Sequence, residues 1–450
     1  MYIYIVDSLL KIILAKGYLT RKASWEILLR VNAGSFSDHA LEKVIANYEF
    51  KTVDIAFIME LSFGCIRYRK LLDLWIDHTS KLSHIKQPPK LRWLLHIGLY
   101  QILKMDKIPH PASISTTVEI AKNSELQGLS GVVNAILRNA IKKLDLDNLP
   151  YVPNNNLDRI SYFESLPTWL VKEMINWFGD FKAERIAKAF NKKPVIDLRI
   201  NILKTDISSC LKDFKVNNIK AEPIENLNNA ITIKGKVGSI KELPGYKEGH
   251  WVVQNRSSQW IAPLLNPKKG EKILDTCAAP GIKTTHLAEL INDQGEIWAI
   301  DRSEKRLRIL AQNLKRLNLK SIKFLTADST NLVNLKPEFE SYFDKILIDA
   351  PCSGIGTLSR NPDARWTLNK KKIDELRSIQ EELLLSNLSL LKKSGTLLYS
   401  TCTICPSENN LLIKKFIEDN KQLLLIEEKQ ILPDLDNEKD GFYAAIIKFR

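Results

Sequence analysis

The sequence has few cysteines and no recurring set of metal ligands. Six cysteines in 450 residues are too few for a disulfide scaffold and fit a reducing cytoplasm. Cys402 and Cys405 form one Cys-x-x-Cys pair, which leaves zinc or redox chemistry as an alternative, but the second pair that a zinc site needs is missing. Four histidines show no common metal spacing: His78, His84, His96 and His110. We therefore expect no bound metal.

A long uninterrupted apolar run is also missing. The first sixteen residues, MYIYIVDSLLKIILAK, are apolar, yet Asp7 and Lys11 interrupt them and no basic region precedes them. No small-residue cleavage site follows, and the stretch is too short to span a bilayer. We expect residues 1–19 to be a helical or strand-like N-terminal extension. The protein is accordingly expected to be cytoplasmic, with no membrane partner.

Acidic residues are outnumbered by basic ones. The formal net charge is +14 and the pI is about 9.3, which favours a polyanionic partner such as RNA. A chain of 450 residues is too long for one core, so two or three domains are expected.

The pattern of apolar residues divides the chain. Residues 20–147 repeat apolar side chains at helical spacing and predict an all-helical bundle. The Pro- and Asn-rich stretch LPYVPNNN predicts a linker over 148–160. Residues 161–253 combine helical periodicity with short alternating strands and predict a small α+β subdomain. A fragment that begins near Asn156 is expected to fold without the residues before it.

Residues 254–450 alternate strands with helices, which predicts a doubly wound α/β domain of the Rossmann type. Its last strand, 441–449, is expected to be an antiparallel edge strand. The strand that starts at Lys272 runs into a Pro280-Gly281 turn and an amphipathic helix, a geometry that brings backbone N–H groups up to an anionic ligand group. Asp301 ends the next strand, where such folds hold a ribose.

Two cysteines follow the ends of later strands. Cys352 follows the strand that ends at Asp349, and Cys402 follows the strand before Thr401. Methylation of a cytosine at C5 needs a thiolate that adds to C6 and a base that removes the C5 proton. We interpret Cys402 as the nucleophile and Cys352 as the base.

Three alternatives stay open from the residues themselves. Free cysteines are often buried space-filling residues. A DNA cytosine methyltransferase would use Cys352 for attack and would not need Cys402. A binding scaffold could carry an inactive methyltransferase fold, although it would have no need for both cysteines and the strand-end aspartates.

Four segments resemble the NOL1/NOP2/Sun family of RNA cytosine-5 methyltransferases, in particular the bacterial Sun/RsmB branch that methylates 16S ribosomal RNA. They are CAAPGIKTTHLAE (277–289), DAPCSGIGTLSRNPDARW (349–366), STCTICPSENN (400–410) and DGFYAAIIKF (440–449). The resemblance implies that S-adenosyl-L-methionine is the cofactor. It implies a cofactor site made of Cys277, Ala278, Ala279, Pro280, Gly281, Ile282, Lys283, Asp301, Asp328 and Asp349, with Asp349 also catalytic beside Cys402 and Cys352.

The same resemblance extends to partners. The segments 113–122 and 128–139 are similar to the RNA-binding NusB fold. A monomer that acts on free or early-precursor 16S rRNA is implied. Five side chains are predicted to contact RNA: Arg199, Lys204, Arg360, Arg365 and Trp366. Where the family commonly has Gly-Gly and Gln-Asp, this chain has Gly281-Ile282 and Gln254-Asn255.

Overall fold

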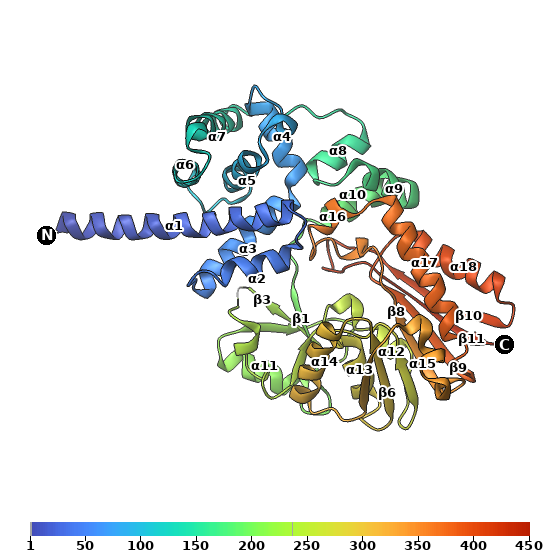
Figure 1. Cartoon of the computed structure of the whole chain (residues 1–450). Helices are drawn as coiled ribbons and strands as arrows, with labels where there is room; N and C mark the ends of the chain where they lie inside the picture. The colour runs from blue at the N-terminus through green and yellow to red at the C-terminus, as the bar shows by residue number, and fades with distance from the viewer. Residues whose placement is uncertain (1, 236) are drawn as a thin grey trace. The chain divides into compact units, whose positions relative to one another are not determined.

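The computed structural model describes residues 2–235 and 237–450, with side chains from Gly17 onward (Figure 1). The chain forms two compact units. The first contains the described residues up to Asn191 together with Asn361–Thr367, and the second contains Lys192–Arg360 and Leu368–Arg450.

The first unit is helical. Its helices are α1 (Tyr2–Asn32), α2 (Ser37–Ile45), α3 (Thr52–Arg67), α4 (Arg69–Thr79), α5 (Pro89–Lys104), α6 (His110–Lys122), α7 (Ser130–Asp145), α8 (Asn156–Phe163), α9 (Thr168–Phe178), α10 (Asp180–Ala189) and α16 (Ala364–Thr367). Helix α5 has proline at its first position and buries apolar residues on most of its circumference, which places it at the centre of the core.

The predicted extension 1–19 is helical from Tyr2 and continuous with the rest of α1; the side-chain packing of its residues before Gly17 lies outside the described part. The predicted linker contains the start of α8. Because α8, α9 and α10 belong to the first unit, a cut near Asn156 divides that unit. The expectation that a fragment from Asn156 folds independently stays a prediction, and such a fragment would carry α8, α9 and α10 without the other helices of their unit.

The second unit starts with a four-stranded antiparallel sheet in the order β2-β3-β1-β4. Its strands are β1 (Ile196–Ile200), β2 (Lys220–Pro223), β3 (Ala230–Lys234) and β4 (Trp251–Val253), and helix α11 (Ile207–Val216) packs on it through Cys210 and Phe214.

A seven-stranded sheet follows, in the order β10-β11-β9-β8-β5-β6-β7. Its strands are β5 (Lys272–Asp275), β6 (Glu296–Asp301), β7 (Ile322–Thr326), β8 (Phe343–Asp349), β9 (Leu391–Thr401), β10 (Leu423–Ile431) and β11 (Phe442–Phe449). The five strands from β9 to β7 are parallel. The fold is thus the predicted one: a helical domain, an α+β subdomain and a Rossmann-like domain.

Helices cover both faces of this sheet (Figure 1). One face carries α12 (Ile261–Leu264), α13 (Ile282–Leu290) and α14 (Glu304–Leu317), and the other carries α15 (Leu332–Leu335), α17 (Lys370–Asn387) and α18 (Asn410–Asp419). Helix α14 shows how sequence sets this packing, because Leu307, Leu310, Leu314 and Leu317 recur at helical spacing and are its buried residues.

The last strand differs from its predicted place. Strand β11 lies between β9 and β10, so it is an inner antiparallel strand and not an edge strand. Phe442–Ile447 are all buried, which fits a strand paired on both sides, whereas most of β10 is exposed, as expected at an edge. In the described part of the chain, no helix is long and apolar enough to cross a membrane.

Candidate active site

The two cysteines meet at the carboxyl edge of the seven-stranded sheet. Strands β8 and β9 are parallel neighbours, with Asp349 paired to Ser400, so the loops that follow them leave the sheet side by side. The Sγ atoms of Cys352 and Cys402 are 3.4 Å apart, and both residues are partly exposed. The two sulfurs are thus close enough to share a proton, and both can be reached from solvent.

Two glycines allow the cysteine loops to approach each other. Gly354 has φ +66°, a left-handed conformation that favours glycine. A Cβ at Gly356 would lie 2.7 Å from the carbonyl oxygen of Cys402 and 2.3 Å from that of Gly441. The Gly356 N–H donates to the Cys402 carbonyl at 3.1 Å, which ties the first loop to the second.

The pKa values of the two thiols are shifted in opposite directions. The pKa of Cys402 is lowered, first because Cys352 donates a hydrogen bond to its sulfur and further by the nearby Lys283 ammonium. The pKa of Cys352 is raised well above that of a free thiol, by the same hydrogen bond, by burial, and by the charges of Cys402 and Glu408. The thiolate therefore belongs on Cys402 and the proton on Cys352.

Asp349 fixes the ammonium that faces Cys402. Lys283 Nζ lies 2.5 Å from Asp349 Oδ2, and Ser400 Oγ donates to Asp349 Oδ1 at 2.8 Å. Burial lowers the pKa of Lys283, but the Asp349 carboxylate more than offsets this and the pKa is raised. Lys283 is consequently a permanent positive charge beside the reactive sulfur.

The Pro-Gly turn has the geometry of a cofactor cradle. Gly281 has φ +95°, and a Cβ there would lie 2.2 Å from Leu310 Cδ1, so only glycine fits before α13. Asp301 at the end of β6 is buried and accepts the Ala279 N–H at 3.1 Å and the Ser303 N–H at 2.9 Å. The turn and the strand end are thereby held together.

Asp275 was not predicted as a site residue. Its carboxylate is buried, Oδ2 accepts from Thr284 Oγ1 at 2.7 Å, and Oδ1 has no hydrogen-bond partner among the residues that the structure describes. Burial, with the charge of Asp349, raises the pKa of Asp275 to about 7. An unpartnered buried acceptor beside the turn fits a ligand with N–H donors, such as the amino group of an amino acid.

Asp328 lies farther into solvent than the other strand-end aspartates, with 41% of its side chain exposed. It caps a short turn by accepting from Thr330 and forms an ion pair with Arg302 at 2.7 Å. Three of the remaining predicted cofactor residues belong to the turn itself: Cys277, Ala278 and Pro280. Ile282 is the first residue of α13 and packs against the core on that face of the sheet.

Comparison with known proteins identifies this arrangement. A family model described as 16S rRNA methyltransferase RsmB/F matches residues 262–448, a NusB family model matches 19–142, and a ferredoxin-like domain model of RsmF/B-like methyltransferases matches 166–239. A relative from Synechocystis sp., "Probable ribosomal RNA small subunit methyltransferase B", is 39% identical over 89% of each chain. The chain belongs to the RsmB/F family.

Further relatives agree. "Ribosomal RNA small subunit methyltransferase B" from Photorhabdus laumondii is 33% identical over 96% of this chain and 98% of its own. The crystal structure of PH0851 superposes with a TM-score of 0.80 at 25% identity, over 96% of this chain and 98% of that chain. As a member of the RsmB/F family, this enzyme is an S-adenosylmethionine-dependent methyltransferase, and the cofactor supplies an electrophilic methyl group.

The structure contradicts the predicted RNA contact of Arg199. Its side chain is 1% exposed and pairs with the buried Glu289 at 2.8 Å. It also donates to the Ile282 carbonyl, to Thr285 Oγ1 and to Gln254. Arg199 therefore joins β1 to α13, and its buried guanidinium is not available to a phosphate.

Arg365 is buried as well, in the helical unit. Its side chain is 0% exposed and donates to the carbonyls of Arg67, Ser165 and Phe190 and to Asn191 Oδ1, at 3.1 to 3.3 Å. Burial lowers the pKa of Arg365 to about 9. The prediction that Arg365 contacts RNA is therefore wrong, because the side chain is buried and its terminal N–H groups donate to acceptors within the protein.

Trp366 anchors the same segment. Its Nε1 donates to the Ile66 carbonyl at 2.7 Å, its ring packs against the helical core, and the Arg69 guanidinium lies 5.5 Å from the ring centroid. Asp363 accepts from the N–H and hydroxyl of Ser37. Trp366 is thus a packing residue, and the prediction that it stacks on a nucleotide is not supported.

The other two predicted RNA contacts keep some exposure. Lys204 is exposed and donates to the carbonyls of Glu248 and Arg316. Arg360 has 30% of its side chain exposed and forms an ion pair with Asp440 at 2.6 Å. Both stay predictions.

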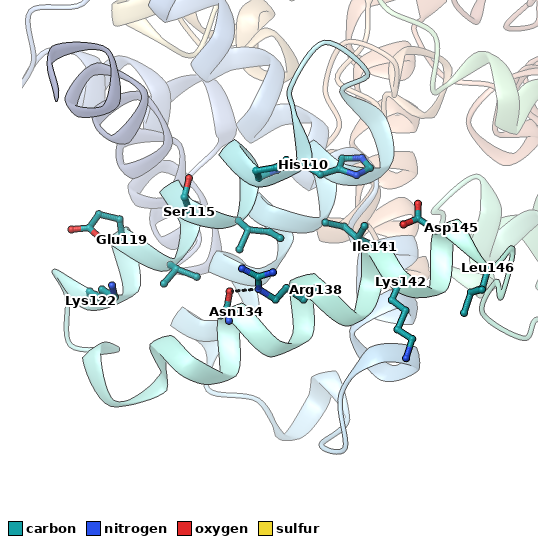
Figure 2. A pocket seen from close by; sticks show the side chains of 13 residues that line it. His110, Ser115, Glu119, Lys122, Asn134, Arg138, Ile141, Lys142, Asp145 and Leu146 are labelled. Atoms are coloured by element: carbon teal, nitrogen blue, oxygen red, sulfur yellow. Dashed lines mark hydrogen bonds between the residues drawn. The ribbon is translucent and has the colours of Figure 1, made fainter. Parts of the chain in front are cut away.

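A groove of about 860 Å³ lies between α6 and α7 of the helical unit, and its lining includes none of the predicted site residues (Figure 2). Arg138 projects into it and donates to Asn134 at 3.0 Å. Its rim carries Lys122 and Lys142 but also Glu119 and Asp145, over a floor of aliphatic side chains.

Proposed function

We propose that this enzyme methylates C5 of a cytosine in 16S rRNA through a covalent adduct between Cys402 and C6 of the base. The observation that carries the proposal is the 3.4 Å contact between the two sulfurs, with Lys283 beside Cys402. A second cysteine within proton-transfer distance of the nucleophile supplies the base that release of a C5-methylated adduct requires.

The chemical steps can be written with each atom accounted for. The Cys402 thiolate bonds to C6, and the Cys352 proton passes to N3 of the ring. C5 becomes nucleophilic and takes the methyl group, and S-adenosylhomocysteine leaves. The Cys352 thiolate removes the C5 proton, the C5–C6 double bond forms again, and the C6–S bond breaks to regenerate the Cys402 thiolate. N3 then gives its proton to solvent.

The proposed cofactor site is the predicted one, from Cys277 to Lys283 with Asp301, Asp328 and Asp349. Asp301 accepts the ribose hydroxyls, the turn before α13 takes the amino-acid part, and Asp328 faces the adenine. The close approach at Gly281 and the buried, bonded position of Asp301 support this arrangement.

Replacing Asp301 by alanine is expected to weaken binding of S-adenosylmethionine more than about tenfold, because each charge-assisted hydrogen bond contributes roughly 1.5–3 kcal/mol. Isothermal titration calorimetry with the cofactor alone measures this. Asp301→Asn keeps an acceptor for the Ala279 N–H. Its affinity for S-adenosylmethionine is therefore expected to lie between that of the wild-type enzyme and that of Asp301→Ala. Glu304→Ala, at an exposed position on α14, is the matched control. Unchanged affinity in Asp301→Ala would remove this residue from the site.

The proposed substrate is free or early-precursor 16S rRNA bound by a monomeric enzyme in the cytoplasm. A base must leave its stack to reach the cysteines, and this costs less before the RNA is packed into a subunit. We expect bisulfite sequencing of ribosomal RNA from a deletion strain to show the loss of one methylcytosine in 16S rRNA. Purified enzyme is expected to restore it on deproteinised rRNA from that strain. An identical methylcytosine pattern in both strains would contradict the proposal.

A further inference from the structure

A buried carboxylate lies directly behind the two cysteine loops. Glu408 is 0% exposed and belongs to the short turn Pro406–Glu408 after Cys402. Its Oε1 accepts the Ser353 N–H at 2.8 Å, and its Oε2 accepts the Ser353 hydroxyl at 2.5 Å. Glu408 thus holds both donors of the residue that follows Cys352.

The network extends to the other loop and to α17. The Ser353 hydroxyl is 2.7 Å from Thr403 Oγ1, and Thr403 follows Cys402. Gln380 on α17 donates to Glu408 Oε1 at 3.0 Å and to the Pro351 carbonyl at 2.8 Å. Ser353, Gln380, Thr403 and Glu408 are all buried, so these bonds are shielded from water and hold the two loops in one arrangement.

Glu408 also places a negative charge on one side of the cysteine pair. Its charge disfavours ionisation of Cys352, whereas the Lys283 charge favours ionisation of Cys402. Other groups around the pair are Asp349, which opposes ionisation of Cys402, and the buried hydroxyl of Tyr399. Lys283 and Glu408 therefore polarise the pair in the same direction.

We propose that Glu408 is a positioning residue that holds the Cys352 loop and keeps the shared proton on Cys352, so that Cys402 is the nucleophile. The inference rests on the proposed function, because it explains how two neighbouring cysteines take different roles. In this proposal Glu408 does not contact the reacting base, but it determines which of the two sulfurs attacks.

Alkylation of the free enzyme tests this without RNA or cofactor. Iodoacetamide reacts with thiolates, so peptide mass spectrometry gives the rate for each cysteine as a function of pH. In the wild-type chain Cys402 is expected to react faster than Cys352 near neutral pH. In Glu408→Gln the ratio of the two rates is expected to fall about tenfold, which corresponds to about one pKa unit, and the pH profile of Cys352 should shift downward.

Two controls separate this role from a general loss of structure. Glu418→Gln removes an exposed carboxylate from α18 and is expected to leave the ratio unchanged. Cys405, which is 2% exposed, should stay unreacted in every folded variant. If Glu408→Gln does not fold, Ser353→Ala removes the hydroxyl bond while keeping the charge and the packing, and it is expected to lower the ratio less.

An unchanged alkylation ratio in folded Glu408→Gln or Ser353→Ala would overturn the inference. This outcome is distinct from failure of the proposed function, because alkylation needs no methyl transfer. A shifted ratio without a covalent RNA adduct in Cys352→Ala would leave the role of Glu408 standing and contradict the adduct mechanism.

Discussion

Replacing Cys402 by alanine is expected to lower methyl transfer to RNA by more than about a thousandfold, because the covalent step loses its nucleophile. Binding of S-adenosylmethionine should be unaffected, since no hydrogen bond joins this thiol to Asp301 or to the turn before α13 in the described structure. Transfer of labelled methyl groups to 16S rRNA and calorimetry with the cofactor measure the two effects separately.

Cys352→Ala is expected to give the opposite signature. The Cys402 thiolate still attacks, with N3 taking its proton from solvent in place of Cys352, and methylation still occurs, but no base remains to remove the C5 proton. A covalent enzyme–RNA adduct should therefore accumulate and appear as a slower band on a denaturing gel. Cys405→Ala is the control, because Cys405 lies in the same loop but is buried. An adduct in Cys402→Ala and none in Cys352→Ala would reverse the roles and favour the DNA-type mechanism.

Replacing Arg365 by alanine is expected to destabilise the helical unit by about 3–5 kcal/mol. Its removal leaves three backbone carbonyls and one amide oxygen without this donor, two of the carbonyls being in buried bonds, and each unsatisfied buried group costs roughly 1–3 kcal/mol. Urea unfolding followed by tryptophan fluorescence measures the change, because Trp366 lies in the same segment.

Arg365→Lys is expected to recover only part of this loss, because an ammonium cannot reproduce the planar fork of donors. Arg138→Ala, at an exposed position on α7, should change the unfolding free energy by less than about 0.5 kcal/mol. Equal unfolding midpoints for Arg365→Ala and Arg138→Ala would show that these buried contacts do not hold the segment.

The sequence predicted the features that depend on local pattern. Strand periodicity located Asp301 and Asp349 at strand ends, and parallel pairing then brought Cys352 and Cys402 together as the loops after β8 and β9. Gly281 was predicted by its place between a strand and a helix, where its positive φ is required.

Features that depend on distant partners were not predicted. Arg199 finds Glu289 only through the tertiary fold, and Arg365 is satisfied mainly by backbone carbonyls, which no side-chain pattern reveals. Glu408 lies in the segment 400–410, but its partner Ser353 lies in the segment 349–366, about fifty residues earlier in the chain. The signal available in the sequence was an acidic residue, Glu408, close to the apolar pair Ile404-Cys405. A carboxylate in buried surroundings needs hydrogen-bond donors, so this pattern indicates a buried hydrogen-bond network.

The chain passes from the helical unit to the catalytic unit after Asn191, returns at Asn361 and leaves again after Thr367. During synthesis the helical unit therefore emerges without the segment that fills its core around Ile66. At roughly 5–20 residues per second, the ribosome needs on the order of 10 s to reach that segment. Each nascent chain thus carries a helical unit without Asn361–Thr367 for this interval, and a ribosome that stalls before Asn361 leaves a chain in which the Ile66 carbonyl lacks the Trp366 donor.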